Sequence, residues 1–233
     1  MDSKIGILCA GDRELAPFLP CLQNMRIVEK AMLKIHVGSL NGVPVVMLFS
    51  GACKVNAAIA AQILIDHFGV DTIINAGTAG GMHPALQILD TVVSTEVAYH
   101  DVAGKILTDF HPWMDSVWFQ ADARLLALAR AAAEKQNADR PVHFGRMVTG
   151  EAFIADEGRD AINTSFQPLS VDMETAAVAH VCHVNGIPFL AVRTITDTAD
   201  HSGSGHFEQN CVQASTLSKD FVLALLDEMK FKA

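Results

Sequence analysis

The sequence is poor in aromatic residues, which make up 6% of its 233 positions, with one Tyr and two Trp. Half of all residues are hydrophobic, so the core must be built mainly from Ala, Val, Ile and Leu. A chain of this length is ordinary for one α/β domain with a sizeable core. No linker, repeat or low-complexity segment divides it, and we expect a single domain over residues 1–233.

The sequence also lacks an excess of basic residues and any long apolar run. Its formal net charge is -9 and its pI is about 5.5. This charge argues against nucleic acids and anionic membranes as partners, because both require basic patches. No run of about 18 apolar residues predicts a membrane span, and no signal-type segment opens the chain. We therefore expect a soluble cytoplasmic protein.

Paired cysteines are absent as well. The five cysteines are Cys9, Cys21, Cys53, Cys182 and Cys211. Their number is odd and none lies in a CxxC or zinc-type spacing, so we expect reduced thiols. The ten histidines are scattered, and neither Cys182-His183 nor His201 with His206 has the spacing of metal ligands. We predict neither a metal site nor a cofactor.

Strands and helices alternate along the chain. Apolar runs predict strands at residues 4–10, 32–39, 43–50, 72–76, 90–96, 142–148 and 188–197. Helical spacing predicts helices at residues 54–68, 122–136, 158–166, 175–183 and 207–231. Asn41-Gly42 predicts a hairpin turn, and Asp122 a helix cap. This alternation indicates an α/β fold around a central, largely parallel sheet.

A glycine-rich turn is expected at residues 77–81, directly after a buried strand. It is not a complete dinucleotide fingerprint and has no Walker lysine. Two interpretations stay open for it. The glycines either supply the positive φ of a tight turn, or offer a backbone surface against which a sugar or base can lie.

Residues 170–200 carry the strongest chemical signal. Asp172 and Glu174 lie in a short extended stretch, an Ala/Val-rich helical run follows, and an apolar strand then ends on Asp197. Ligands bind at the carboxyl ends of the strands in open parallel sheets, which favours a chemical role for Asp197. The alternative is a carboxylate that only caps a turn.

Seven stretches of the sequence form an ordered pattern: residues 5–14, 50–58, 75–81, 99–102, 149–154, 171–174 and 193–200. Together they resemble the bacterial 5′-methylthioadenosine/S-adenosylhomocysteine nucleosidase family, within the nucleoside phosphorylase superfamily. The resemblance runs nearly end to end. It implies a three-layer α/β/α sandwich around a mixed, twisted sheet, a homodimer, and a small-molecule nucleoside substrate whose N-glycosidic bond is cleaved to release adenine.

The resemblance also assigns roles to residues. It makes Asp197 the general acid at purine N7, Glu14 the carboxylate that positions and activates water, and Glu174 the ligand of the ribose hydroxyls. Adenine leaves poorly as an anion, so a buried acid of raised pKa that protonates N7 suits this reaction. Taken singly, Glu14 and Glu174 are also ordinary acids at helix starts.

The other implied substrate-binding residues line the sugar, the base or the 5′ pocket. They are Met173 under the sugar, Thr78 near the ribose, Phe153 and Ile154 at the adenine edge, Phe207 at the 5′ pocket, and Asp172, Arg193 and Thr196 within the matched motifs.

Two stretches depart from the family pattern. At residues 11–14, a glycine and Arg13 stand where nucleosidases resemble Ala-Met-Glu-Glu-Glu. A guanidinium suits phosphate, but the spacing is not that of a phosphorylase, so hydrolysis is favoured over phosphorolysis. Residues 105–119, which contain Trp113 and Trp118, replace the segment that shapes the 5′ pocket and reaches the partner subunit.

These departures leave alternatives open. We hypothesise a 5′ preference that differs from methylthio, with an aminofutalosine-type nucleoside as one candidate. A phosphate-dependent nucleoside phosphorylase and a non-catalytic nucleoside-binding protein are the other two.

Overall fold

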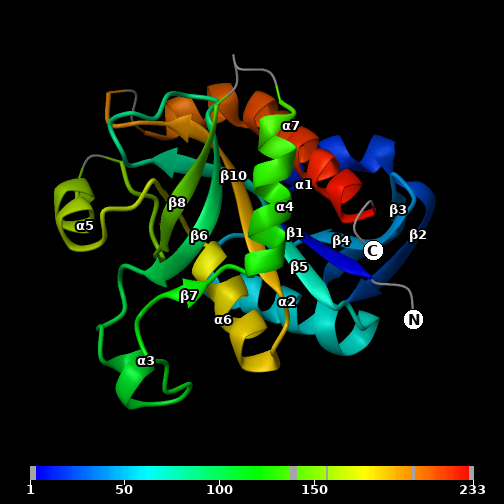
Figure 1. The fold of residues 1–233 in the computed structure, drawn as a ribbon, viewed down its shortest axis with the longest axis horizontal. Helices are drawn as coiled ribbons and strands as arrows, with labels where there is room; N and C mark the ends of the chain where they lie inside the picture. Colours follow the sequence, from blue (N-terminus) through cyan, green and yellow to red (C-terminus); the bar gives the residue numbers. More distant parts are fainter. Residues whose placement is uncertain (1–3, 137–140, 156, 201–202, 231–233) are drawn as a thin grey trace.

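The computed structural model describes residues 4–136, 141–155, 157–200 and 203–230 (Figure 1). The strands are β1 (Ile5–Cys9), β2 (Gln23–Lys30), β3 (Leu33–Leu40), β4 (Val43–Phe49), β5 (Thr72–Gly81), β6 (Thr91–Tyr99), β7 (Phe119–Gln120), β8 (Val142–Thr149), β9 (Ser170–Asp172) and β10 (Phe189–Asp197). The helices are α1 (Asp12–Leu15), the 3₁₀ helix η1 (Ala16–Cys21), α2 (Lys54–Phe68), α3 (Ile106–Asp109), α4 (Ala123–Glu134), α5 (Arg159–Phe166), α6 (Thr175–Asn185) and α7 (Ser204–Lys230).

The strands form one mixed sheet in the order β10-β6-β8-β9-β5-β1-β4-β3-β2, with β7 beside β6. Parallel pairing joins β4, β1, β5 and β10 at its centre. β10 also pairs with β6, and β9 pairs with both β5 and β8, so the sheet curls back on itself.

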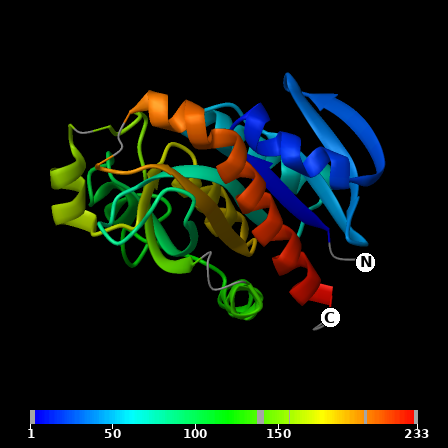
Figure 2. The same ribbon diagram turned by 90° about the horizontal axis from the view of Figure 1, so that it is seen from above.

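Helices α2 and α6 pack into one core and α4 and α7 into another (Figures 1 and 2). Neighbouring residues of β1 separate between these cores: Leu8 belongs to the first and Ile7 to the second. Since successive side chains of a strand point to opposite faces, the two cores lie on opposite sides of the sheet. The expected three-layer α/β/α arrangement is confirmed.

Several local predictions are also confirmed. β3 and β4 form an antiparallel hairpin whose turn residues have positive φ, 49° at Asn41 and 82° at Gly42, as a type I′ turn requires. The side chain of Asp122 accepts a hydrogen bond from Leu125 N at 2.9 Å and caps α4.

The expected glycine-rich turn at residues 77–81 is wrong, because β5 continues to Gly81 as a paired strand. Gly77 is in register with Arg193 of β10. A Cβ at Gly77 would lie 2.5 Å from Glu14 Oε1 and 2.8 Å from Arg193 Nη1. The glycine therefore makes room for two buried charged side chains rather than for a turn.

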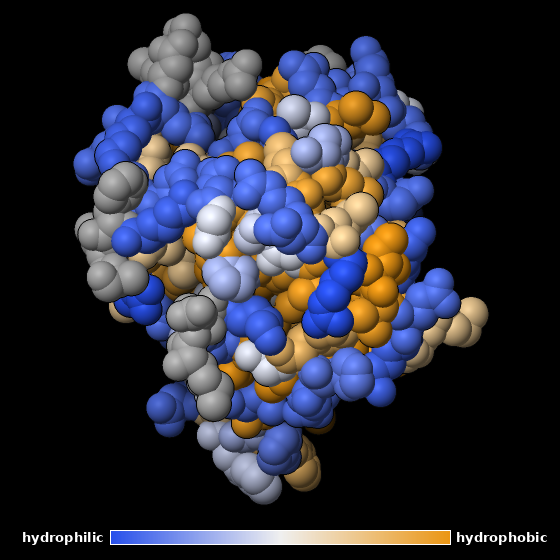
Figure 3. Space-filling view, turned by 90° about the vertical axis from the view of Figure 1, so that its right-hand side faces the viewer, coloured by the Kyte–Doolittle hydropathy of each residue, from blue (hydrophilic) through white to orange (hydrophobic). Residues whose placement is uncertain are grey.

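β2 is an edge strand for which the sequence gives no signal. All eight of its residues are exposed or partly exposed, so it lacks the alternation that marks a half-buried strand. Figure 3 shows hydrophobic surface between polar side chains on this side of the molecule, where Met25, Ile27 and Met32 are exposed. No helix within the described ranges is long and apolar enough to cross a membrane.

Candidate active site

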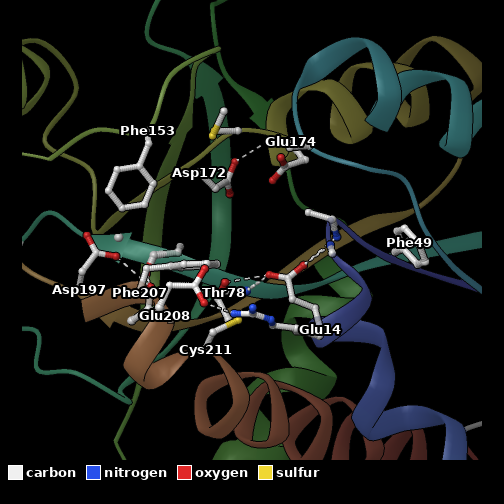
Figure 4. A pocket seen from close by; sticks show the side chains of 18 of the residues that line it. Glu14, Phe49, Thr78, Phe153, Asp172, Glu174, Asp197, Phe207, Glu208 and Cys211 are labelled. Carbon is white, nitrogen blue, oxygen red and sulfur yellow. Dashed lines mark hydrogen bonds and ion pairs between the residues drawn. The ribbon is translucent and has the colours of Figure 1, made fainter. Parts of the chain in front are cut away.

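The carboxyl ends of β1, β5 and β10 open into a cavity of about 570 Å³ (Figure 4). The starts of α1 and α7 and the junction between β9 and α6 complete its wall. Parallel strands therefore place the cavity where ligands bind in α/β folds. Nine residues predicted from the sequence line it: Glu14, Thr78, Phe153, Asp172, Met173, Glu174, Thr196, Asp197 and Phe207.

Glu14 is held on the cavity wall by four donors. Its Oε2 accepts from Ala10 N at 2.8 Å and from Gly11 N at 3.0 Å. Its Oε1 accepts from Thr78 N at 2.7 Å and from the Thr78 hydroxyl at 2.8 Å. A carboxylate has about four lone-pair sites, so its orientation is fixed. Of the four donors, only the Thr78 hydroxyl can rotate away and leave Oε1 to another partner.

Arg193 lies beneath the cavity, fully buried, and its guanidinium faces three acids. Its nitrogens are 3.8 Å from Glu14 Oε1, 3.4 Å from Asp172 Oδ2 and 3.7 Å from Glu174 Oε2. Asn75 Oδ1 accepts from its Nη2 at 2.8 Å. One cation thus offsets part of the charge of a cluster that would otherwise be costly to bury.

Glu174 differs from Glu14 in its bonding. Its Oε1 accepts from Cys53 N at 2.9 Å, and its Oε2 faces Arg193 without a hydrogen bond. Burial raises the pKa of Glu174 to about 7, opposed by Arg193 and reinforced by the charges of Asp172 and Glu14. A carboxylate with free acceptor capacity beside the cavity can accept hydrogen bonds from ligand hydroxyls.

Asp197 ends β10 and is completely buried from solvent, although it borders the cavity. Its Oδ1 accepts from the Thr196 hydroxyl at 2.9 Å, and its Oδ2 lies 3.4 Å from Arg159 Nη2. Burial raises the pKa of Asp197, whereas the Thr196 hydroxyl and the Arg159 guanidinium lower it. An acid of this kind can hold a proton closer to neutral pH and donate it.

Two predicted residues do not line the cavity, namely Ile154 and Arg193. The backbone carbonyl of Ile154 instead accepts from Arg159 Nη2 at 3.5 Å. The sequence analysis missed Arg159, which also donates to Gly81 O at 2.6 Å and lies next to Asp197. It had no sequence signal beyond a position at the start of a predicted helix.

The cavity wall contains further residues that the sequence analysis did not identify as ligands, among them Phe49, Glu208 and Cys211. Glu208 and Cys211 follow Phe207 at positions i+1 and i+4, so this helical spacing was the available signal. The Phe153 and Phe207 rings meet edge to face with centroids 6.3 Å apart.

The described wall is strongly acidic. Its carboxylates are Asp12, Glu14, Asp172, Glu174, Asp197 and Glu208. Arg13 is the single Lys or Arg among the described lining residues, and it pairs with Glu208. Such a wall favours an uncharged or cationic ligand core over a dianion.

Comparison with known proteins agrees with this geometry. A family model described as "Phosphorylase superfamily" matches residues 4–227. A 5′-methylthioadenosine/S-adenosylhomocysteine nucleosidase of Actinobacillus succinogenes is 37% identical over 231 residues, covering 97% of this chain and 100% of that protein.

Solved structures are similarly close. A crystal structure of such a nucleosidase from Colwellia psychrerythraea in complex with adenine has a TM-score of 0.89 and 33% identity, covering 98% of this chain and 96% of the other. A futalosine hydrolase of Helicobacter pylori has a TM-score of 0.87 and 25% identity, covering 97% and 98%. The chain belongs to the phosphorylase superfamily and, within it, to the 5′-methylthioadenosine/S-adenosylhomocysteine nucleosidase family.

Proposed function

We propose that this protein hydrolyses the N-glycosidic bond of 5′-substituted adenine nucleosides such as 5′-methylthioadenosine or S-adenosylhomocysteine, and releases adenine and a ribose derivative. The observation that carries the proposal is one cavity in which the buried acid Asp197 and the firmly held carboxylate Glu14 both take part in the wall. Relatives similar along the whole chain bear the name of this activity.

Asp197 is the general acid. The C–N bond breaks more readily when purine N7 gains a proton, since neutral adenine is a better leaving group than its anion. Because burial raises the pKa of Asp197, its protonated form persists to higher pH than that of an exposed aspartate. A positioned acid of this kind contributes roughly 10²- to 10⁴-fold in rate.

The other acids act on the sugar side. Glu14 orients and activates the attacking water, which takes the acceptor site that the Thr78 hydroxyl vacates. Glu174 accepts from the ribose hydroxyls, and its negative charge with that of Glu14 stabilises the oxocarbenium-like transition state. Met173 packs under the sugar.

The remaining predicted residues shape the base and 5′ ends. Phe153 and the backbone at Ile154 face adenine, Thr196 orients Asp197, and Phe207 forms a wall of the 5′ pocket. Asp172 and Arg193 position the catalytic carboxylates from beneath.

Hydrolysis is favoured over phosphorolysis by the charge of the wall. The described lining residues include six carboxylates and the already paired Arg13. Phosphate in the position of the attacking water would face Glu14 at close range, which is repulsive in a buried site.

We further propose a cytoplasmic homodimer that acts in methionine salvage. Ile106, Phe110 and Trp113 supply an exposed apolar cluster, with exposed fractions of 46%, 63% and 67%. Large exposed apolar groups gathered on one loop are typical of protein interfaces. The five unpaired cysteines fit a reducing compartment.

The test is adenine release from 5′-methylthioadenosine, S-adenosylhomocysteine, adenosine and aminofutalosine, with and without phosphate. We expect phosphate-independent release that falls roughly 10²- to 10⁴-fold in Asp197→Asn. Asp200→Asn, at an exposed aspartate three residues away, is the matched control and should retain activity.

Other outcomes would contradict the proposal. Release that requires phosphate would indicate a phosphorylase. Tight binding of these nucleosides without release would indicate a binding protein.

A further inference from the structure

Arg13 stands between two hollows of the surface. It lines the 570 Å³ cavity, and it also lines a second hollow of about 440 Å³. The second hollow lies between the first helical segments and α7, and is lined by Arg13, Ala16, Pro17, Val212, Thr216 and Lys219. A ligand that extends out of the active-site cavity at this point must pass the guanidinium.

The guanidinium of Arg13 is only lightly committed. Its Nη1 pairs with Glu208 Oε2, and both side chains are about half exposed, at 50% and 57%. No other described group accepts a hydrogen bond from this guanidinium, although it has five N–H donors. Exposed ion pairs contribute little to stability, so an incoming anion can replace Glu208 at small cost.

The path from the ribose to Arg13 is open. A Cβ placed on Gly11 would meet nothing within 4 Å, so the wall between Glu14 and Arg13 leaves space for a chain of atoms. With the base at Asp197 and the ribose at Glu174, the 5′ substituent is the part of the substrate that can leave toward residues 11–13. This orientation rests on the proposed function.

We propose that Arg13 binds a carboxylate at the end of the 5′ substituent, and that the protein prefers adenine nucleosides whose 5′ tail is an acid over those with a neutral tail. A guanidinium binds a carboxylate with two parallel hydrogen bonds. Among the described residues that line the main cavity, Arg13 is the single Lys or Arg able to do so. A short tail ends at Arg13, and a longer apolar tail continues along Pro17 and Val212.

The test compares kcat/KM for S-adenosylhomocysteine with kcat/KM for 5′-methylthioadenosine. We expect Arg13→Met to lower this ratio roughly tenfold or more, because a bidentate charge-assisted contact is lost. Arg13→Lys should recover part of it. A 5′-aminoalkylthio nucleoside, which has the tail and amine but no carboxylate, should not lose the same factor.

Lys219→Met is the matched control, since it removes a cation that lines only the second hollow and pairs with Asp220. A ratio that changes less than about threefold in Arg13→Met, or an equal loss for the amine-tailed nucleoside, would overturn the assignment.

Calorimetry separates this proposal from the proposed function. The same nucleosides are titrated into Asp197→Asn with and without Arg13→Met. Weaker binding of the acid-tailed nucleoside alone supports the role of Arg13 even if no nucleoside is hydrolysed. Equal binding by the two variants refutes it even if hydrolysis is confirmed.

Discussion

Glu174 makes the stability of this protein depend on pH, and Glu174→Gln removes that dependence. The carboxyl is 5% exposed, and burial together with the nearby charges of Asp172 and Glu14 raises its pKa despite the attraction of Arg193. The folded protein therefore keeps a proton on Glu174 at pH values where the unfolded chain has already lost it.

The sign and size of the effect follow from linkage. The stability that this proton contributes is fully present below the unfolded pKa and is lost as the pH rises through the folded pKa. The pKa is 4.5 for an ordinary glutamate and about 7 in the folded protein. At about 1.4 kcal/mol for each tenfold change, the loss between these limits is about 3 kcal/mol.

Glutamine preserves the rest of the site. Its carbonyl oxygen can still accept from Cys53 N, which lies 2.9 Å from Glu174 Oε1. The attraction between Arg193 and the ionised carboxylate is already contained in the folded pKa. We therefore expect the free energy of unfolding of Glu174→Gln, relative to wild type, to increase by about 3 kcal/mol between pH 4.5 and pH 8.

Urea denaturation of both proteins at pH 4.5, 6, 7 and 8 measures this difference. Glu151→Gln, at an exposed glutamate beside the same Cys53, controls for the loss of one negative charge at the rim. A Glu174→Gln difference that stays constant across the four pH values refutes the reasoning. Adenine release should fall in the same variant, because a neutral amide stabilises the cationic transition state less.

Two further predictions concern the acid and the interface. Arg159→Met removes a cation 3.4 Å from Asp197 Oδ2 and should raise the pKa of Asp197, moving the basic limb of the pH profile of kcat/KM upward, whereas Arg159→Lys should not; an unmoved limb contradicts it. Phe110→Asp places a charge on the exposed apolar loop and should convert a dimer into a 25.0 kDa monomer by light scattering; a wild-type protein that is already monomeric contradicts the interface.

The sequence predicted those elements whose local pattern agrees with their final environment. The Ala/Ile/Leu spacing of α2, the Asn41-Gly42 hairpin and the apolar strand that ends on Asp197 all belong to this class. In each case the residues that set the local conformation are also those that pack into the core.

The missed features depend on partners far along the chain. The extended backbone at Gly77 is required by the side chains of Glu14 and Arg193, which are 63 and 116 positions away. β2 pairs at an exposed edge, and Arg159 acts on Asp197 from another helix. Local propensity contains no information on such contacts, so they appear only once the chain is folded.

The placement of Arg193 beneath the cavity explains how one site can keep several acids with different duties. A cation inside the cavity would pair with Glu174 directly and block its contact with ribose hydroxyls. From below, at 3.7 Å and without a hydrogen bond to Glu174, Arg193 limits the repulsion among the three carboxylates while their acceptor oxygens stay available. Asp197 lies outside this cluster and has the more weakly placed Arg159 instead. The same chain thereby favours the charged form of the sugar-side acids and leaves the base-side acid able to hold a proton.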